Sequence, residues 1–162
     1  MAERVSVDRA MAIGEEYFAQ GYTCSQSSLQ GLQAAFGFDG EDLWTLATGF
    51  GGGLGRKQLV CGALTGGVIA AGAIVAAKRA STRDDRAALR DETYALVREL
   101  HDRFQARFGC TDCRTLTGFD FSEPDGYKRF SESGQKERVC HEAVRFVIQT
   151  VAELAEPPRQ KP

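Results

Sequence analysis

The sequence lacks an excess of charge of either sign, because 20 lysines and arginines face 22 aspartates and glutamates, for a net charge of −2. The charges are spread along all 162 residues, without a basic block or an acidic tail, and this argues against binding to nucleic acid. The N-terminus, MAERVSVDRA, has acidic residues and no apolar run of the kind found in a signal peptide. We therefore expect a cytoplasmic protein, in a reducing compartment.

Histidine is scarce, and the standard phosphate-binding motifs are missing. The two histidines are His101 and His141. His141 directly follows Cys140, and on a helix the two side chains would point about 100° apart, which makes a shared metal ion awkward. We predict that neither histidine is a ligand or a base. The loop GFGGGLGRK contains neither GxxxxGK[ST] nor a GxGxxG that follows a strand, so it does not predict nucleotide binding.

No stretch alternates apolar and polar residues as a β-strand would, so we predict an all-α fold. Apolar spacing, caps and glycine stops indicate a single helical domain over residues 1–156 and a disordered tail over 157–162. Four longer helices and one or two short ones are expected to surround a buried central helix. Helices are predicted at 7–20, 24–36, 41–48, about 57–78 (the central helix), 84–108 and 137–156, with a short segment at 114–117 and an ordered loop over 119–136.

The central helix contains the longest uncharged stretch, Leu59 to Ala77, with the sequence LVCGALTGGVIAAGAIVAA. Such a stretch is either a membrane span or a helix buried by other helices. About half of it is Ala or Gly, which contribute little to membrane insertion, and basic residues flank both ends, so no orientation is specified. The other predicted helices are amphipathic and need an apolar partner. We therefore favour a buried helix over a membrane span.

The five cysteines are the strongest functional signal. In a reducing compartment they are more often catalytic, redox-sensing or metal-binding than structural disulfides, and the odd number leaves at least one thiol without a partner in the chain. Cys24, Cys61 and Cys140 each lie near the start of a predicted helix, where the helix dipole should lower the thiol pKa. Cys110 and Cys113 form a CxxC motif, which occurs in dithiol oxidoreductases and metal sites. The glycine loop would allow the backbone to approach such a site closely.

Several of these motifs occur together in one known family. GYTCSQSSL around Cys24, the loop GFGGGLGR, CGALTG from Cys61 to Gly66, CRTLTG from Cys113 to Gly118, and Cys140 resemble the C-GCAxxG-C-C family of redox-active proteins. That family has four cysteines and a CGAxxG motif, and the resemblance covers roughly residues 7–154. It implies a redox role for Cys24, Cys61, Cys113 and Cys140, whereas Cys110 is an addition. Auxiliary positions at the same site are Cys110, Gly51, Gly52, Gly53, Arg56, Gly62 and Gly66.

Three functions remain open. In the first, two of the four cysteines exchange electrons with a protein partner as a dithiol and disulfide, which requires no cofactor and makes a thiol–disulfide oxidoreductase conceivable. In the second, all four thiolates bind a single metal ion or an iron–sulfur cluster. In the third, the chain is a helical interaction module without redox chemistry. The sequence does not decide the oligomeric state, and a homodimer is among the options.

Overall fold

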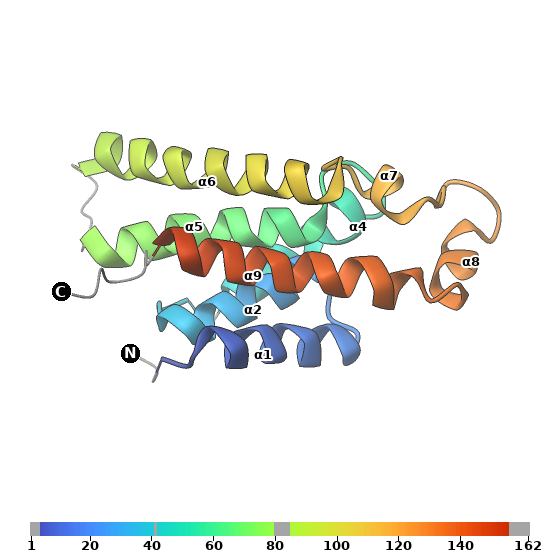
Figure 1. Ribbon diagram of the computed structural model, residues 1–162, viewed down its shortest axis with the longest axis horizontal. Coiled ribbons are helices and arrows are strands. Elements are labelled where there is room, and N and C mark those ends of the chain that lie inside the picture. Colours follow the sequence, from blue (N-terminus) through green and yellow to red (C-terminus); the bar gives the residue numbers. More distant parts are fainter. Residues whose placement is uncertain (1–3, 41, 80–84, 156–162) are drawn as a thin grey trace.

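The computed structural model describes residues 4–40, 42–79 and 85–155, and these residues form the predicted all-α domain (Figure 1). The predicted tail, 157–162, lies outside the described residues. The described residues form no β-strand, and their β-pairing is limited to an isolated antiparallel bridge between Val60 and Asp112. The longer helices are α1 (Val7–Ala19), α2 (Cys24–Phe36), α5 (Gly62–Arg79), α6 (Arg86–Phe108) and α9 (His141–Ala155).

Short elements connect these helices. They are α3 (Leu43–Ala47), a 3₁₀ turn (Thr48–Phe50), α4 (Gly51–Leu54), α7 (Cys113–Thr117), α8 (Gly126–Glu132) and a π-helical turn (Lys136–Cys140) that leads directly into α9. Figure 1 shows the long helices side by side along the long axis of the molecule, with α4, α7 and α8 near the same end. That end holds the cysteines.

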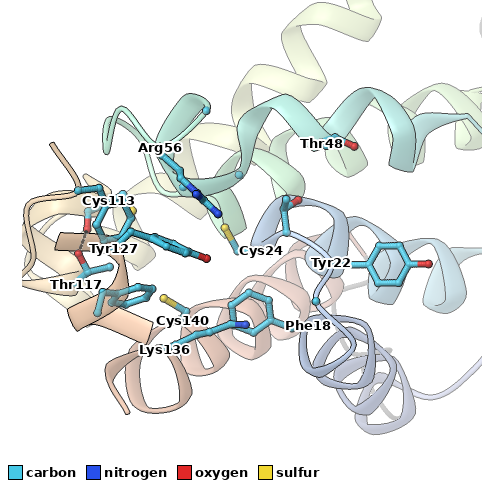
Figure 2. A pocket seen from close by; sticks show the side chains of 17 residues that line it. Phe18, Tyr22, Cys24, Thr48, Arg56, Cys113, Thr117, Tyr127, Lys136 and Cys140 are labelled. Carbon is cyan, nitrogen blue, oxygen red and sulfur yellow. Dashed lines mark hydrogen bonds between the residues drawn. The ribbon is translucent and has the colours of Figure 1, made fainter. Parts of the chain in front are cut away.

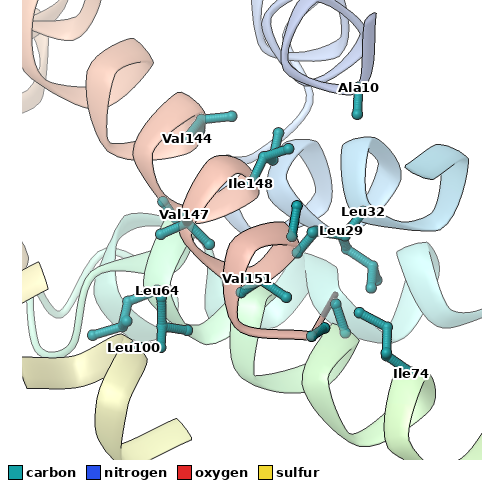
Figure 3. Close-up of a cluster of buried hydrophobic side chains, with 14 of the residues drawn as sticks. Ala10, Leu29, Leu32, Leu64, Ile74, Leu100, Val144, Val147, Ile148 and Val151 are labelled. Atoms are coloured by element: carbon teal, nitrogen blue, oxygen red, sulfur yellow. The ribbon is translucent and has the colours of Figure 1, made fainter. Parts of the chain in front are cut away.

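The core lies between α5 and α9. α5 packs against α2, α6 and α9, and α9 also contacts α1 and α2, so the two helices share the centre of the bundle. Figure 3 shows the apolar side chains that α2, α5, α6 and α9 contribute, including Leu29, Ile74, Leu100 and Ile148, which are at most 2% exposed. Among the described residues, no helix is long and apolar enough to cross a membrane.

Glycines let these helices approach closely. A Cβ added at Gly66 of α5 would lie 2.3 Å from the backbone oxygen of Ser25 on α2, and one added at Gly67 would lie 2.5 Å from Val147 of α9. Distances below about 3 Å are not compatible with a real side chain. The small residues of the uncharged stretch therefore bring α5 against its neighbours, as expected for a helix buried by other helices.

Side-chain caps and glycines explain most helix boundaries. Thr23 forms a capping box with Gln26 at the start of α2, in which the Thr23 hydroxyl accepts from the Gln26 backbone N–H and the Gln26 side chain accepts from the Thr23 N–H. Gly37, Gly109 and Gly118 end α2, α6 and α7 in left-handed conformations with φ of 65°, 77° and 70°. These signals are local in the sequence, which explains why the predicted boundaries of α2 agree with the structure.

The central helix begins later than predicted, at Gly62 instead of about residue 57. The chain before it is not helical, because Gly55, Arg56 and Gln58 have positive φ values of 56°, 66° and 60°. The next residues are extended, and Val60 bridges to Asp112. The absence of charge predicted the interior position of the stretch from Cys61 onward, but Leu59 and Val60 are 54% and 43% exposed, and lack of charge could not distinguish helix from extended chain.

The predicted loop over residues 119–136 contains a helix, α8, so this part of the prediction is wrong. α8 begins after Asp125, which has a φ of 59°. Its Phe130 is buried against Phe119 and Phe121, with ring centroids 5.9 and 5.1 Å apart. This aromatic cluster stabilises a helix that its glycines and serines do not predict.

Candidate functional site

Cys24 occupies the first turn of α2, at the end of the bundle where α5 also begins. Its sulfur lies against the backbone of α5, since a Cβ added at Gly62 would be 2.4 Å from Cys24 Sγ. Burial raises the pKa of Cys24, and the backbone N–H groups of Gly52 and Ala63, and those of Cys24 and Ser25 at the helix start, approach the sulfur and offset part of that rise. Cys24 is therefore surrounded by amides from three segments that are distant in sequence.

A short two-stranded pairing places Cys61 beside Cys113. The Cys61 N–H donates to the Thr111 carbonyl at 2.8 Å, and the Cys113 N–H donates to the Leu59 carbonyl at 2.7 Å. Cys61 immediately precedes α5 and Cys113 begins α7, which Asp112 caps by accepting from the Thr115 N–H at 2.8 Å. Both cysteines are nearly buried, with exposures of 8% and 9%.

Cys140 completes the group from a fourth segment. It is the last residue of the π-helical turn that precedes α9, so it lies about one turn into the helical segment that the sequence predicted from residue 137. π-helical turns are rare and often mark functional positions.

The two histidines lie outside the group of cysteines. His141, the residue after Cys140, packs its ring against Phe18 with centroids 4.8 Å apart. His101 is exposed and pairs with Asp102.

The four cysteines surround one small enclosed cavity. This cavity, of about 20 Å³, is lined by all four of them together with residues of α5, α7, α9 and the π-helical turn, namely Gly62, Ala63, Leu116, Thr117, Val139 and Ala143. A space of this size holds about one water molecule. We call Cys24, Cys61, Cys113 and Cys140 the cysteine cluster. No disulfide joins any of the five cysteines, all of which belong to the described part of the chain.

Cys110 lies apart from the cysteine cluster. It lines neither this cavity nor the larger cleft described below. Its thiol is oriented toward the Phe108 carbonyl at 3.8 Å, and burial and the carboxylate of Asp112 raise its pKa. The CxxC spacing therefore brings only Cys113 to the cluster.

Burial raises the pKa of every thiol in the cluster, whereas the helix-start positions had predicted lowered values. The pKa values of Cys113 and Cys140 rise to about 12, and that of Cys61 rises well above its usual range. For these three thiols the negative charge of a Cys24 thiolate is the next largest cause. Burial removes water from a thiolate, and the free energy that this costs exceeds the stabilisation that the nearby amides provide. Cys24 is thus the common electrostatic neighbour of the other three.

The glycine loop lies against the cluster. Gly52 has a φ of 63° and supplies the amide near Cys24. A Cβ added at Gly53, with a φ of 66°, would lie 2.7 Å from the Leu59 nitrogen and 2.9 Å from Cys113 Cβ. Gly51 is packed on Thr23, where an added Cβ would be 2.6 Å from a methyl carbon. Each glycine therefore occupies space that a side chain could not share.

Gln58 joins the loop to the segment after α7, a role that no sequence motif indicates. It is 3% exposed. Its side-chain amide donates to the Phe119 carbonyl at 2.6 Å, and its side-chain oxygen accepts from the Phe121 N–H at 2.7 Å. A polar residue after a glycine run is usually read as exposed, so only the fold shows that Gln58 orders the chain beside Cys113.

A larger cleft of about 360 Å³ opens beside the cluster (Figure 2). Cys24, Cys113 and Cys140 line it, while Cys61 lines only the enclosed cavity. Its other lining residues include glycines 51, 52 and 55, the aromatic residues Phe18, Tyr22, Phe121, Tyr127 and Phe130, and the cations Arg56 and Lys136. Sequence reasoning singled out Arg56 but missed Lys136 and the aromatic residues, which come from α1, α8, the π-helical turn and the connections before α2 and α8.

The cysteine cluster is not arranged as a ready-made metal site, since over the described residues no group of three or more His, Cys, Asp or Glu side chains is placed to hold a metal ion. Burial raises the pKa values of Cys61, Cys113 and Cys140, so a metal ion that bound there would have to displace their protons.

Comparison with known proteins agrees with this geometry. No curated protein and no solved structure matches the chain. The sequence pattern of one family matches residues 22–154, a range that includes all four cysteines of the cluster, the glycine loop and the CGALTG motif. The chain therefore belongs to the C_GCAxxG_C_C family, whose description is "putative redox-active protein".

Proposed function

We propose that the protein transfers electrons by thiol–disulfide exchange through the cysteine cluster. The observation that supports this most directly is the convergence of Cys24, Cys61, Cys113 and Cys140, from four separate segments, on one enclosed cavity. Inert core cysteines have no reason to gather around a single space. The chain also belongs to a family whose description is redox-active, and this supports the same function.

Cys24 is the attacking thiol in this proposal. Only the thiolate attacks a disulfide, and Cys24 is the cluster member with backbone N–H groups from three segments around its sulfur. It also lines both the cleft and the enclosed cavity. A second cluster thiol must lie near it, and the charge of Cys24 acts on all three of the others.

The reaction then balances in two steps. Cys24 Sγ forms a bond to one sulfur of a substrate disulfide, whose sulfur–sulfur bond breaks and whose other half leaves as a thiol after taking a proton. A second cluster thiol loses its proton and attacks Cys24 Sγ, which releases the remaining half. Two cluster thiols are oxidised to one disulfide, and one substrate disulfide is reduced to two thiols.

The test is a redox titration of the purified protein, prepared without oxygen, against mixtures of reduced and oxidised dithiothreitol. We expect two thiols to disappear and return reversibly, with the new disulfide located by mass spectrometry between Cys24 and another cluster cysteine. Cys24→Ser should prevent this disulfide from forming and so change the titration. Cys110→Ser, a matched change outside the cluster, should leave the titration unchanged. The proposal fails if Cys24→Ser titrates like the wild type.

Metal analysis and a visible spectrum of the same preparation separate the other two functions. Iron with sulfide and visible absorption bands would identify a cluster-binding electron carrier, and would overturn the dithiol proposal. The other outcome is a colourless protein whose wild type shows no reversible loss of thiols and whose four Cys→Ser variants all fold. That result would leave an interaction module without redox chemistry.

A further inference from the structure

The cleft beside the cysteine cluster carries positive charge that no side chain of its lining balances. Arg56 and Lys136 line it, and no aspartate or glutamate does. In the view of Figure 2 the two cations lie on either side of Cys24, Cys113 and Cys140. The chain as a whole has a net charge of −2, so this local excess is opposite in sign to the rest of the molecule.

Two arginines near the cleft are paired with carboxylates. Arg114 pairs with Asp120, and Arg129 pairs with Glu123. Neither Arg56 nor Lys136 pairs with a carboxylate among the described residues. Two cations without counter-ions in a partly enclosed cleft attract an anionic ligand.

Aromatic rings hold both cations toward the cleft. The Arg56 guanidinium carbon lies 3.7 Å from the centroid of the Tyr127 ring, and Lys136 Nζ lies 4.7 Å from that of Phe18. Cation–π contacts of this kind fix a side chain without neutralising its charge. The rings also provide flat apolar surfaces, so the cleft offers both an anion contact and a place for an apolar or planar group.

On the basis of the thiol exchange proposed above, we infer that the cleft binds the substrate itself, and that this substrate is a small disulfide bearing carboxylate groups. At about 360 Å³ the cleft has the volume of a small-molecule site. Cys24, the attacking thiol, is only partly buried and lines this cleft, so a disulfide bound in the cleft lies beside it. Bound there, one substrate disulfide and two cluster thiols would give one cluster disulfide and two substrate thiols.

The experiment compares two aromatic disulfides that differ in charge. Dithiobis-nitrobenzoate is dianionic, dithiodipyridine is neutral at pH 7, and both release a coloured thiol. The ratio of their rates with the reduced protein is divided by the same ratio for mercaptoethanol, which removes their intrinsic difference in reactivity. We expect the wild type to prefer the anionic reagent, and Arg56→Gln and Lys136→Gln each to lower that preference about three- to tenfold.

Lys128→Gln is the matched control, because it removes one exposed positive charge from α8 without touching the cleft lining. It should leave the preference unchanged. If it lowers the preference as much as the cleft variants do, or if Arg56→Gln and Lys136→Gln leave the preference at the wild-type value, the cleft does not select an anionic substrate and the inference is overturned.

A non-reactive analogue separates failure of this inference from failure of the redox proposal. The methyl thioether of thionitrobenzoate has the same ring and carboxylate but no disulfide, and its binding is measured by calorimetry. Binding that weakens in Arg56→Gln and Lys136→Gln supports the cleft even if the thiol titration fails. If the dithiothreitol titration succeeds but the thioether does not bind, the redox function stands and the assignment of its substrate does not.

Discussion

Close contact between α2 and α5 should make Gly66→Ala strongly destabilising. The new Cβ would lie 2.3 Å from the Ser25 oxygen and 3.0 Å from both the carbonyl carbon and Cα of Ser25. These are backbone atoms, so no rotation of a side chain relieves the clash, and the helices must separate by about 1 Å to restore ordinary contact.

The expected magnitude follows from two opposing effects. Overpacking a well-packed core costs about 1–3 kcal/mol and sometimes more, whereas replacing glycine by alanine inside a helix stabilises it by about 1 kcal/mol. Because the obstacle at Gly66 is backbone, we expect the upper part of the first range and, after the gain in helix propensity is subtracted, a net loss of about 1–2 kcal/mol. For a chain of this length that corresponds to a Tm lower by about 2–8 °C.

Gly72→Ala on the same helix is the matched control. The nearest atom to its Cβ would be a methyl carbon of Thr93, 4.0 Å away, so only the gain in helix propensity remains, and we expect about 0.5–1 kcal/mol of stabilisation. Urea unfolding followed by circular dichroism measures both variants. If Gly66→Ala were as stable as Gly72→Ala, α2 and α5 would not approach as closely as the structure shows.

Two further predictions concern the residues beside the cluster. Gln58→Leu leaves the Phe119 carbonyl and the Phe121 N–H without their buried partner, so urea unfolding should show a loss of about 2–4 kcal/mol. The exposed change Gln149→Leu should stay within about 0.5 kcal/mol, and equal losses would show that the Gln58 bonds are unimportant. A thiol has a pKa of about 8.5–9 when unfolded, but Cys113 and Cys140 have values of about 12 in the fold. The folded state therefore holds more protons above about pH 9, and the free energy of unfolding of the reduced protein should fall from there by up to about 1.4 kcal/mol per pH unit for each thiol. Below about pH 8 this contribution is fully present. Cys113→Ser should lose less stability than the wild type between about pH 9 and 10.5, and parallel curves would contradict the raised pKa.

The sequence predicted the parts of the fold that depend on local signals. The boundaries of α2 follow from Thr23 and Gly37, and the interior position of α5 follows from its lack of charge. α8 was missed because its stability comes from Phe130 packing on Phe119 and Phe121, which are brought to it by the fold. The start of α5 was misplaced because Arg56 and Gln58 have positive φ values. Arginine and glutamine rarely adopt this conformation, so it cannot be predicted from the residue type.

The candidate site divides in the same way. The motifs identified the four cysteines and the glycine loop, but the spacing between Cys110 and Cys113 gave no indication that only Cys113 reaches the cluster. The direction of the thiol pKa shifts was predicted wrongly, because a position at a helix start can be read from sequence whereas burial by three other segments cannot. Lys136 and Tyr127 were missed for the same reason, since each contributes to the cleft only through tertiary packing.

In the thiol exchange that we propose, the raised pKa values favour reaction of the cluster as a two-electron site over reaction of four independent thiols. A thiolate at Cys24 disfavours ionisation of Cys61, Cys113 and Cys140, so one attacking sulfur forms at a time while the others keep their protons. Oxidation removes this repulsion between thiolates, because a disulfide carries no charge and is compatible with an apolar cavity. Burial therefore slows unselective reaction of the reduced thiols and favours the step in which a second cluster thiol closes the disulfide. The glycine loop supports this arrangement by bringing the Gly52 amide to Cys24, where amides from three separate segments offset part of the rise in pKa that burial causes.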